Sequence, residues 1–409
     1  MLRNLRAAIR FRHFEWNPAL RRLARAACTD DLRRIAENRL PGGVFDYIDG
    51  AAEDESALER NCRAFDKVGF HPRVLRDVSQ VKSQTTLLGQ PLSFPLVLAP
   101  TGFTRIAHSQ GELAAARAAE RAGLPYTLST LGTRSIEEVA AVSEGRKWFQ
   151  VYVWKDRGLV KEMLERAAQH QFEAIMITVD TPVFGRRERD IRNGFTLPPQ
   201  MGFDTLLSGV THPGWAWDFL RADPITFANV GGRSEGGDKD PIVLADYINS
   251  QFDPALSWHD VEWFQQHWKG PIILKGIQSV EDARLAAQSG LEAIALSNHG
   301  GRQLDQGPAI VDLVAPVADA VGDEIEIICD GGIRRGSDIL KAVALGARAC
   351  MIGRPYLYAL GAGGEKGIDF LLQHLHEGLR QTMALVGSND ILELDSDLII
   401  ERETGKAAE

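Results

Sequence analysis

Cysteine is scarce in this chain: only four of its 409 residues are cysteine, at positions 28, 62, 329 and 350. No two of them show the short paired spacing that is typical of zinc sites and redox motifs. Cys329 and Cys350 lie in apolar runs, where a reduced thiol packs as a small apolar side chain. The sequence therefore favours reduced structural thiols over a metal site or a disulfide.

Long hydrophobic runs are also missing. No stretch approaches the roughly 18 apolar residues of a membrane-spanning helix, and the first residues lack the apolar core of a signal peptide. We therefore expect neither a spanning helix nor secretion, but a cytoplasmic protein that is soluble or bound at the inner face of the cell membrane. The content of 44% apolar and 25% charged residues is typical of a globular chain.

The chain also lacks an excess of positive charge: 46 lysines and arginines stand against 55 acidic residues, and the net charge is −9. This balance argues against nucleic acid as a main partner. The first 28 residues are the exception, with seven arginines against the single acid Glu15. This arm is either solvated or a segment that lies on an anionic membrane surface, because apolar residues are interleaved with its arginines. They are Leu2, Leu5, Ile9, Phe11, Phe14 and Trp16.

Eight short apolar runs recur from residue 95 onward, with amphipathic stretches between most of them. Each run is continuous rather than alternating, which is typical of strands that are buried on both faces. Eight such strand–helix units predict an α/β fold, the (β/α)8 TIM barrel. The runs are 95–100, 125–129, 148–153, 174–180, 271–276, 293–298, 325–330 and 347–353.

One connection is far longer than the others. Roughly 95 residues separate the ends of the fourth and fifth predicted strands, which places an inserted loop, about 198–253, on the face where barrel enzymes build active sites. Residues 231–240 resemble a disordered segment, whereas 212–220 contain an aromatic cluster. Trp215 and Trp217 in this cluster indicate either a membrane or partner surface, or packing against the protein itself.

The predicted organisation is a basic arm over residues 1–28, one barrel domain over 29–390 that contains the insertion, and a C-terminal tail over 391–409. A helical segment precedes the first strand. We expect Thr29 to lie at the capped start of a helix that ends near Pro41, and a second helical piece with a glycine break to follow.

The strongest motif is SNHGGRQLD at 297–305, which begins where the sixth predicted strand ends. His299 and Arg302 would both project into the mouth of the barrel, where catalytic groups lie in this architecture. A histidine can accept a proton near neutral pH, and an arginine can bind a carboxylate through two parallel hydrogen bonds. The motif therefore predicts acid–base chemistry on an anionic substrate.

Two glycine-containing motifs follow the last two strands: DGGIRRG at 330–336 and IGRP at 352–355. The loops after strands seven and eight form the usual phosphate site of this barrel, and glycines there allow close approach of a phosphate to the backbone. Arg334 and Arg354 would add positive charge. A tight turn without a ligand is the alternative for the first motif alone.

Polar residues also occur at the ends of other strands: Ser129, Gln150, Tyr152, Thr178, Asp180 and Lys275. A buried Lys275 needs an anionic partner, because an unpaired buried ammonium group is costly. A reduced flavin would supply that negative charge, and Gln150 and Thr178 could meet the amide edges of its ring. Asp180 is placed to orient His299. The alternative for each residue alone is an ordinary hydrogen bond at the end of a strand.

Together these motifs resemble the FMN-dependent α-hydroxy acid oxidases and dehydrogenases, over roughly residues 29–390. The resemblance implies that His299 is the active-site base, supported by Asp180. It also implies that Arg187 of TVDTPVFGRRE, Arg302 and Tyr47 of FDYIDGAAEDE bind the substrate carboxylate. Tyr152 of FQVYVWKDR is similar to the tyrosine that binds the substrate hydroxyl.

The same resemblance implies which residues bind FMN. They are Pro100, Thr101 and Gly102 of APTG, then Ser129, Gln150, Thr178, Lys275 and Ser297, with Asp330, Gly331, Gly332, Ile333, Arg334, Gly353 and Arg354 at the phosphate. No metal is implied. Leu131 and Phe103 are expected to bound the substrate side chain, and a homotetramer is expected from the family.

Two departures narrow the assignment. Many oxidases of the family have alanine where this chain has Gly102, and the long insertion resembles that of membrane-associated lactate and mandelate dehydrogenases. With the basic arm, these features favour an L-lactate dehydrogenase that yields pyruvate and passes electrons to a quinone or cytochrome. The alternatives are an oxidase that forms H2O2 from oxygen, a lactate monooxygenase, and glycolate or mandelate as substrate.

Overall fold

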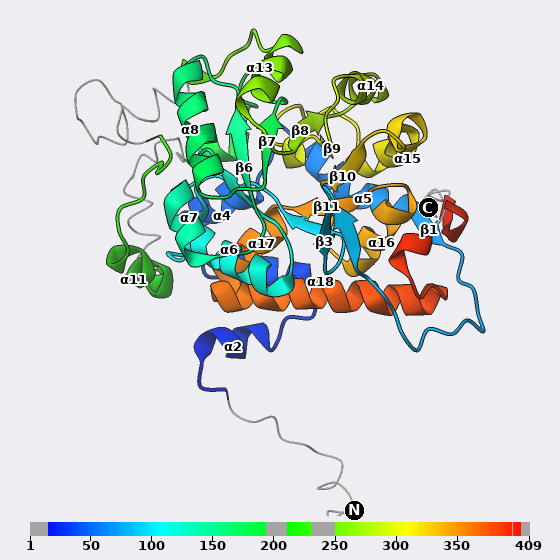
Figure 1. The fold of residues 1–409 in the computed structure, drawn as a ribbon. Helices are drawn as coiled ribbons and strands as arrows, with labels where there is room; N and C mark the ends of the chain where they lie inside the picture. Colours follow the sequence, from blue (N-terminus) through cyan, green and yellow to red (C-terminus); the bar gives the residue numbers. More distant parts are fainter. Residues whose placement is uncertain (1–14, 194–210, 231–249, 395, 402–409) are drawn as a thin grey trace, which may run out of the picture.

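A computed structural model describes residues 15–193, 211–230, 250–394 and 396–401. Its centre is a closed barrel of eight parallel strands in the order β10-β11-β4-β5-β6-β7-β8-β9 (Figure 1). All eight predicted runs form barrel strands, so the predicted fold class is confirmed. The strands are β4 (Leu96–Leu98), β5 (Tyr126–Ser129), β6 (Lys147–Tyr152), β7 (Ala174–Thr178), β8 (Ile272–Ile277), β9 (Ala293–Ser297), β10 (Glu326–Asp330) and β11 (Ala349–Ile352).

The hydrophobic core has two layers, because alternate residues of a strand point to opposite faces. Met176 of β7 belongs to a cluster inside the barrel, whereas its neighbours Ile175 and Ile177 belong to the cluster between the strands and the surrounding helices. Leu87 and Leu92 join the inner cluster from the hairpin of β2 (Thr85–Leu87) and β3 (Gln90–Leu92). The barrel is therefore a packed core and not a pore.

Amphipathic helices surround the barrel (Figure 1). Several begin with side-chain caps: Ser135 and Glu138 form a reciprocal capping box, and Asp156 and Ser279 accept backbone N–H groups. The helices are α6 (Gly111–Ala122), α7 (Ile136–Val142), α8 (Arg157–Gln169), α13 (His259–His267), α14 (Val280–Gln288), α15 (Ile310–Val321), α16 (Gly336–Ala344), α17 (Arg354–Gly363) and α18 (Glu365–Val386).

The segment before the barrel is helical, as expected. It contains α2 (Pro18–Leu23), α3 (Thr29–Glu37), α4 (Gly42–Asp49), α5 (Ser56–Lys67) and β1 (Val68–Phe70). Thr29 is itself helical and does not cap α3; its hydroxyl instead donates to the carbonyl of Arg334 at 2.5 Å. At the other end of the chain, β12 (Ile399–Glu401) pairs antiparallel with β1.

The long insertion after β7 is confirmed: α9 (Glu188–Arg192) precedes the predicted range, and α11 (Pro213–Arg221) lies in the described part of it. The two tryptophans of the aromatic cluster have different environments. Trp215 packs against the protein and donates from Nε1 to the carbonyl of Ile106 at 2.8 Å, whereas Trp217 is 60% exposed. Residues 231–240 and the first half of the basic arm, residues 1–14, lie outside the described residues.

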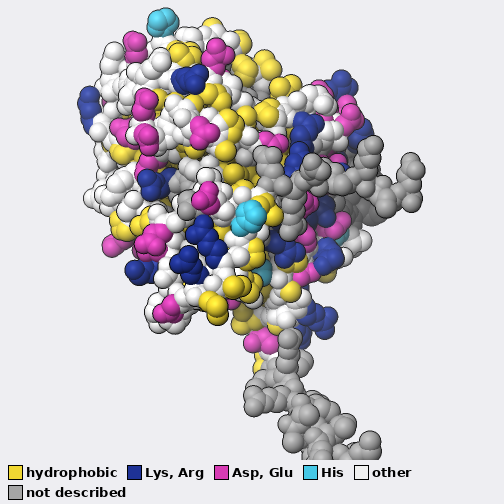
Figure 2. All heavy atoms as spheres, turned by 90° about the vertical axis from the view of Figure 1, so that its right-hand side faces the viewer, with side chains coloured by type: hydrophobic (Ala, Val, Ile, Leu, Met, Phe, Trp, Pro, Cys, Tyr) yellow, Lys and Arg dark blue, Asp and Glu magenta, His cyan; other side chains and the backbone are white. Residues whose placement is uncertain are grey.

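Charges of both signs are mixed with apolar side chains on the face that Figure 2 shows, so no field of one sign covers it. Among the described residues, no helix has the length and apolar character needed to cross a membrane. In the same ranges, no three histidine, cysteine or acidic side chains gather as a metal site would require. All four cysteines are free thiols.

Candidate active site

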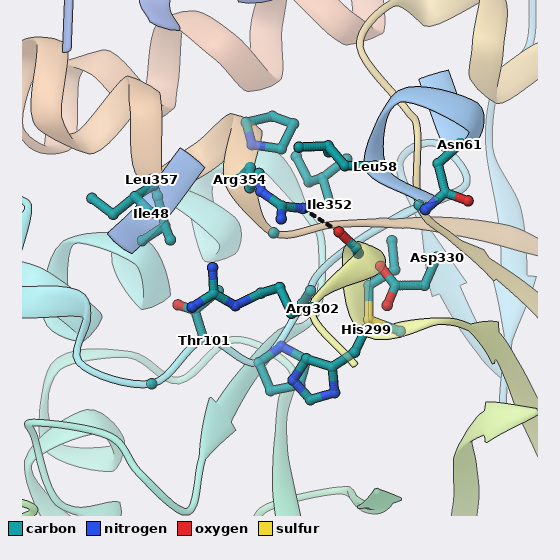
Figure 3. Close-up of a pocket in the computed structure, with 18 of the residues that line it drawn as sticks. Ile48, Leu58, Asn61, Thr101, His299, Arg302, Asp330, Ile352, Arg354 and Leu357 are labelled. Carbon is teal, nitrogen blue, oxygen red and sulfur yellow. Dashed lines mark hydrogen bonds between the residues drawn. The ribbon is translucent and has the colours of Figure 1, made fainter. Parts of the chain in front are cut away.

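A cavity opens at the carboxyl ends of the strands, and we call it the active-site cavity (Figure 3). Asp330 and Asn61 lie together on one side of it, and Ile48 and Leu357 lie on the opposite side. Most of the predicted site residues line it: Tyr47, Pro100, Thr101, Gly102, Tyr152, Arg187, Lys275, His299, Arg302, Asp330, Gly331, Gly332, Ile333, Arg334, Gly353 and Arg354. Five others are not among the lining residues: Ser129, Gln150, Thr178 and Ser297 are buried at or near the ends of their strands, and Asp180 follows β7 with its side chain 2% exposed.

His299 and Asp180 form a hydrogen-bonded pair. His299 Nδ1 lies 3.0 Å from Asp180 Oδ1, so the ring presents Nε2 to the cavity as a proton acceptor when Nδ1 carries the hydrogen. Burial lowers the pKa of His299, and the charge of Asp180 opposes this shift. Burial would raise the pKa of Asp180, but the nearby His299 and Lys275 hold it below its ordinary value. The pair is thus a neutral imidazole supported by a carboxylate.

Local backbone geometry allows this close approach. Gly276 has a φ of +116°, and a Cβ at that position would lie 2.7 Å from the Cβ of Asp180. Only glycine adopts this conformation readily and leaves room for the carboxylate. His299 itself has a φ of 57°, in a short 3-10 turn that follows β9 directly. Strained backbone of this kind is concentrated at functional sites.

Two arginines give the cavity a positive charge. Arg302 donates from Nη1 to the carbonyls of Tyr47 and Gly50, both at 2.8 Å, and its guanidinium lies 5.0 Å from the centre of the Tyr47 ring. Burial, and then the neighbouring charge of Arg187, lowers the pKa of Arg302. Neither arginine forms an ion pair with a carboxylate in the described part of the chain, and the buried Nε of Arg187 lacks a partner there. The cavity is therefore suited to an anion.

Lys275 has an anionic partner within the protein itself. Its Nζ lies 2.9 Å from Ser297 Oγ and 3.3 Å from Asp330 Oδ2, and Ser297 Oγ donates to the same carboxylate oxygen at 2.7 Å. The argument that a buried lysine needs a counter-charge was correct, but Asp330 already supplies one. The sequence did not reveal this, because it cannot show that the ends of β8 and β10 lie within reach of each other across β9.

Beneath the cavity, polar side chains from three adjacent strands form a chain of hydrogen bonds. Ser129 Oγ donates to Gln150 Oε1 at 2.9 Å, and Gln150 Nε2 donates to Thr178 Oγ1 at 2.9 Å. All three residues are at most 2% exposed. These three side chains are thus linked to one another by hydrogen bonds, and their predicted contact with FMN stays a prediction.

The backbone of the first glycine-containing loop, after β10, is approached closely by a neighbouring part of the protein. Gly332 has a φ of +80°, and a Cβ there would lie 2.0 Å from the carbonyl of Asn61. Arg354 is held by three backbone carbonyls, those of Asp49, Gly50 and Gly300, at 2.7 to 3.1 Å, and Figure 3 draws one of these bonds. This arginine therefore also ties the loop after β11 to the loop after α4.

Sequence reasoning missed or misplaced a few residues. Asn61, on α5 outside the barrel, exchanges side-chain hydrogen bonds with Asn298 at 2.8 and 3.0 Å, and no local motif marked it. Phe184 also lines the cavity, and its place three residues before Arg187 was an available signal. Leu131 lines the cavity as expected, but Phe103 does not, because its ring packs on Phe227 of the insertion with centroids 5.0 Å apart.

Residues 36–401 match the family model described as FMN-dependent dehydrogenase. The chain belongs to this family. Its members use FMN, so FMN is the cofactor of this enzyme. An L-lactate dehydrogenase of Chromohalobacter salexigens is 41% identical over 93% of this chain and 96% of its own length. A second L-lactate dehydrogenase, from Pectobacterium atrosepticum, is 41% identical over 92% and 97%.

Solved structures give the same result for the fold. The FMN-dependent dehydrogenase described here is similar to (S)-mandelate dehydrogenase, described as a monotopic membrane protein, with a TM-score of 0.89 and 36% identity. The match covers 92% of this chain and all of the other. A mandelate oxidase is similar with a TM-score of 0.79 and 38% identity, over 92% and 98% of the two chains.

The cavity fits FMN by the chemistry of the groups that line it. Gly331, Gly332, Gly353 and Arg334 line it, and glycine backbone with an arginine cation is suited to bind a phosphate. Thr101 and Lys275 line the same cavity together with the apolar Leu131 and Met351, a combination that suits a flat ring with a polar edge. His299 and Arg302 lie in the same cavity, within one continuous site.

Proposed function

We propose that this enzyme oxidises an L-2-hydroxy acid to the 2-oxo acid, and that its main substrate is L-lactate, which yields pyruvate. One observation carries the proposal: a neutral His299, supported by Asp180, shares a cavity with Arg187 and Arg302, which lack carboxylate partners among the described residues. A 2-hydroxy acid has a carboxylate for the two arginines and an adjacent hydroxyl proton for the histidine.

Each side chain then has a definite task. Arg187, Arg302 and Tyr47 bind the carboxylate and fix the orientation of the substrate. Tyr152 donates a hydrogen bond to the substrate hydroxyl, because burial raises the pKa of Tyr152 and keeps its phenol protonated. His299 Nε2 accepts the hydroxyl proton, and Asp180 stabilises the imidazolium that results. FMN, when bound, would take up the two electrons of the oxidation together with the α-hydrogen of the substrate, so that both hydrogens lost by the hydroxy acid are accounted for.

The proposed FMN contacts follow the arrangement of the cavity. Asp330 to Arg334, Gly353 and Arg354 would hold the phosphate, while Pro100, Thr101 and Gly102 would lie along the ring. Lys275, held by Ser297 and Asp330, would place its ammonium group where negative charge develops. Ser129, Gln150 and Thr178 would support the ring edge from below.

Replacement of His299 by Gln tests the proposed base. The variant should keep its yellow colour and its fold, because His299 makes no contact that buries a large apolar surface. The rate at which L-lactate reduces the flavin should fall by at least roughly 100-fold, since general-base catalysis contributes a factor of about 10²–10⁴. Stopped-flow absorbance of the flavin measures this rate. Unchanged flavin reduction in a fully loaded variant would refute the role of His299.

The substrate side chain is tested by comparing kcat/KM for L-lactate, (S)-mandelate and glycolate with one artificial acceptor. Leu131, Tyr152 and Phe184 line the cavity and leave an apolar wall for a small side chain, and L-lactate dehydrogenases are among the relatives. L-lactate should give the highest value. Mandelate is the second candidate, since mandelate dehydrogenase has a similar structure; a higher kcat/KM for mandelate would reassign the substrate and keep the chemistry.

We also propose that a quinone or cytochrome, rather than oxygen, is the electron acceptor. The support is the resemblance described above: Gly102 stands where many oxidases of the family have alanine, and a Cβ there would lie 3.1 Å from the Cβ of Leu131. The enzyme, bleached by L-lactate without air, should reoxidise faster with a quinone analogue than with dissolved oxygen. Fast reaction with oxygen would instead indicate an oxidase or a monooxygenase.

Replacement of Gly102 by Ala provides the matched variant. Leu131 must yield by a few tenths of an ångström, so we expect a loss of stability below about 1.5 kcal/mol. We expect more H2O2 per turnover in this variant than in the parent enzyme, as a peroxide assay would show. Equal peroxide yields in both proteins would show that Gly102 does not limit the reaction of the enzyme with oxygen.

We further propose that the enzyme is cytoplasmic and binds peripherally to the inner face of the cell membrane. Exposed apolar side chains on α2 and α11 and next to α2 support this: Trp16, Leu20, Trp217 and Leu220. Removal of residues 205–245 should release the enzyme from a membrane pellet without loss of flavin. An intact enzyme that is already soluble in cell extracts would contradict the proposal. The homotetramer and the boundaries at 28 and 390 stay predictions.

A further inference from the structure

A second cavity, of about 470 Å³, lies between α2 and α11, and no residue that lines it also lines the active-site cavity. Its walls come from five separate parts of the chain, one of which is Gly363 on α17. Arg22 lies on α2, Arg39 follows α3, His108 precedes α6, and Trp217 and Arg221 lie on α11. We call it the arginine cavity.

Arg22 and Arg39 share a single protein acceptor. Arg22 Nε and Arg39 Nη1 donate to the carbonyl of Ala362, at 3.3 and 3.2 Å. A guanidinium has five N–H donors, so this one carbonyl leaves most of them available. Neither side chain forms an ion pair with a carboxylate anywhere in the described part of the chain. Two cations are thus held close together with little local compensation.

The electrostatics agree with this geometry. Burial, followed by the charge of Arg22, lowers the pKa of Arg39 to about 10, and burial with the charge of Arg21 lowers the pKa of Arg22. Both groups remain protonated at neutral pH. The protein therefore keeps two charged guanidinium groups partly out of water, a cost that an anion between them would offset.

The other charged groups of the cavity leave it positive. The guanidinium of Arg221 lies 3.9 Å from the centre of the Trp217 ring. Asp218, the one carboxylate in the wall, accepts from the backbone N and the hydroxyl of Ser109 at 2.7 and 2.5 Å, and its Oδ2 lies 3.6 Å from Nδ1 of His108. Burial lowers the pKa of His108, so this ring adds no charge at neutral pH. Three arginines then stand against one carboxylate.

We propose that the arginine cavity binds an oxyanion of the phosphate type. Arginine presents planar N–H pairs that match two oxygens of such a group. The anion could be free phosphate or the headgroup of a phospholipid, since Leu220 and Trp217 beside the cavity are 78% and 60% exposed. The site does not depend on the oxidation chemistry proposed above, because its residues lie outside the active-site cavity.

The competing explanation needs no ligand. Arg22 and Arg39 would then serve only to neutralise the carbonyl end of α17, whose last turn contains Ala362. This explanation predicts that both side chains affect stability alone, and that no anion binds with a defined affinity.

The first experiment uses the FMN-loaded full chain and inorganic phosphate. Titration calorimetry at constant ionic strength should show saturable binding at one site. The Arg39→Gln variant should raise the Kd at least about tenfold, since a charge-assisted hydrogen bond is lost. Arg22→Gln should act in the same direction. Arg25→Gln is the matched control: it removes an exposed arginine next to α2 that does not line the cavity, and should change the Kd less than about twofold.

The second experiment separates the two sources of the anion by co-sedimentation with phosphatidylcholine vesicles, with and without phosphatidylglycerol. Saturable phosphate binding that Arg39→Gln weakens supports a free-anion site. A headgroup site is supported if phosphate binds weakly and vesicle binding depends on the cavity. Vesicle binding should then fall about tenfold in Arg39→Gln but not in Arg25→Gln. The proposal is overturned if phosphate does not saturate and both variants bind vesicles equally. If Arg39→Gln loses flavin or melts early, Arg22→Gln on the exposed α2 decides the same question.

Discussion

At the scale of single residues, Asp180 shows how the site holds a charge out of water. Its carboxylate is buried, Oδ1 is hydrogen-bonded to His299, and Oδ2 has no hydrogen-bond partner among the described atoms. Burial of an unpaired carboxylate oxygen is costly. The cost is offset by the hydrogen bond from His299 and by the nearby charge of Lys275, which help to hold the pKa of Asp180 down.

Replacement of Asp180 by Asn should separate orientation from charge. The amide leaves the size of the side chain unchanged but removes the negative charge that raises the pKa of His299. The pKa of His299 should therefore fall further below 6.5, and the acid limb of the kcat/KM profile should move to lower pH. We expect kcat/KM itself to drop by roughly 10²–10⁴. A pH profile with an unmoved acid limb would contradict the proposed coupling.

Gln150 and Lys275 could be predicted as candidate site residues, because a buried strand otherwise consists of apolar residues. Their partners could not be predicted in the same way. Lys275 pairs with Asp330 across β9, and Asn61 reaches the site from outside the barrel. Contacts of this kind depend on how distant segments are arranged in space. A single sequence indicates that arrangement only where it contains a motif as specific as the one around His299.

At the scale of elements, the insertion is fastened to the loop that follows β4. Arg105, which is 3% exposed, donates to the carbonyls of Asp223 and Pro224, and Trp215 donates to the carbonyl of Ile106. The same loop carries Gly102 at the active-site cavity. The insertion is therefore attached directly to one wall of the site.

Replacement of Arg105 by Met should loosen this attachment. The variant keeps apolar contact but loses two hydrogen bonds to backbone carbonyls, for which we expect a loss of about 1–3 kcal/mol in the free energy of unfolding. The insertion should also be cut faster by chymotrypsin, which does not cleave after the arginine that is replaced. Arg221→Met, at an exposed position of α11, is the control and should change stability by less than about 0.5 kcal/mol.

The elements themselves followed from the sequence more completely than the contacts between them. Continuous apolar runs predicted all eight barrel strands, because both faces of each strand are covered. Thr29 was misjudged as a cap, since its hydroxyl bonds to Arg334 far along the chain instead of to its own helix. Phe103 was misjudged as a substrate contact, since the insertion provides Phe227 to cover it.

At the scale of the whole molecule, the C-terminal end of the described chain is joined to the segment that precedes the barrel. Ile399, Ile400 and Glu401 pair with Phe70, Gly69 and Val68. Ile391 and Leu398 between α18 and β12 are 3% and 6% exposed. The segment that was predicted as a tail therefore contributes buried apolar side chains.

A chain that stops after Asp390 tests this contribution. Ile391 and Leu398 each bury most of an apolar side chain, at roughly 1.5–3 kcal/mol apiece, so the truncated enzyme should lose about 3 kcal/mol or more. Denaturant unfolding of the loaded enzyme measures the difference. A chain that stops after Glu401 is the control and should match the full length. Equal stability of all three would confirm 390 as the domain boundary.

The closure of the barrel also sets when the enzyme can acquire FMN during its synthesis. β4 pairs with β11, with Leu96 beside Cys350 and Leu98 beside Ile352. The residues suited to bind the phosphate follow the last two strands, and they include Gly331, Gly332 and Arg334. Thr101, in contrast, follows the first strand. At about 5–20 residues per second, a ribosome needs on the order of ten seconds or more to travel from one to the other. Throughout that interval the FMN site of the nascent chain is incomplete, so we expect FMN to bind only near the end of translation.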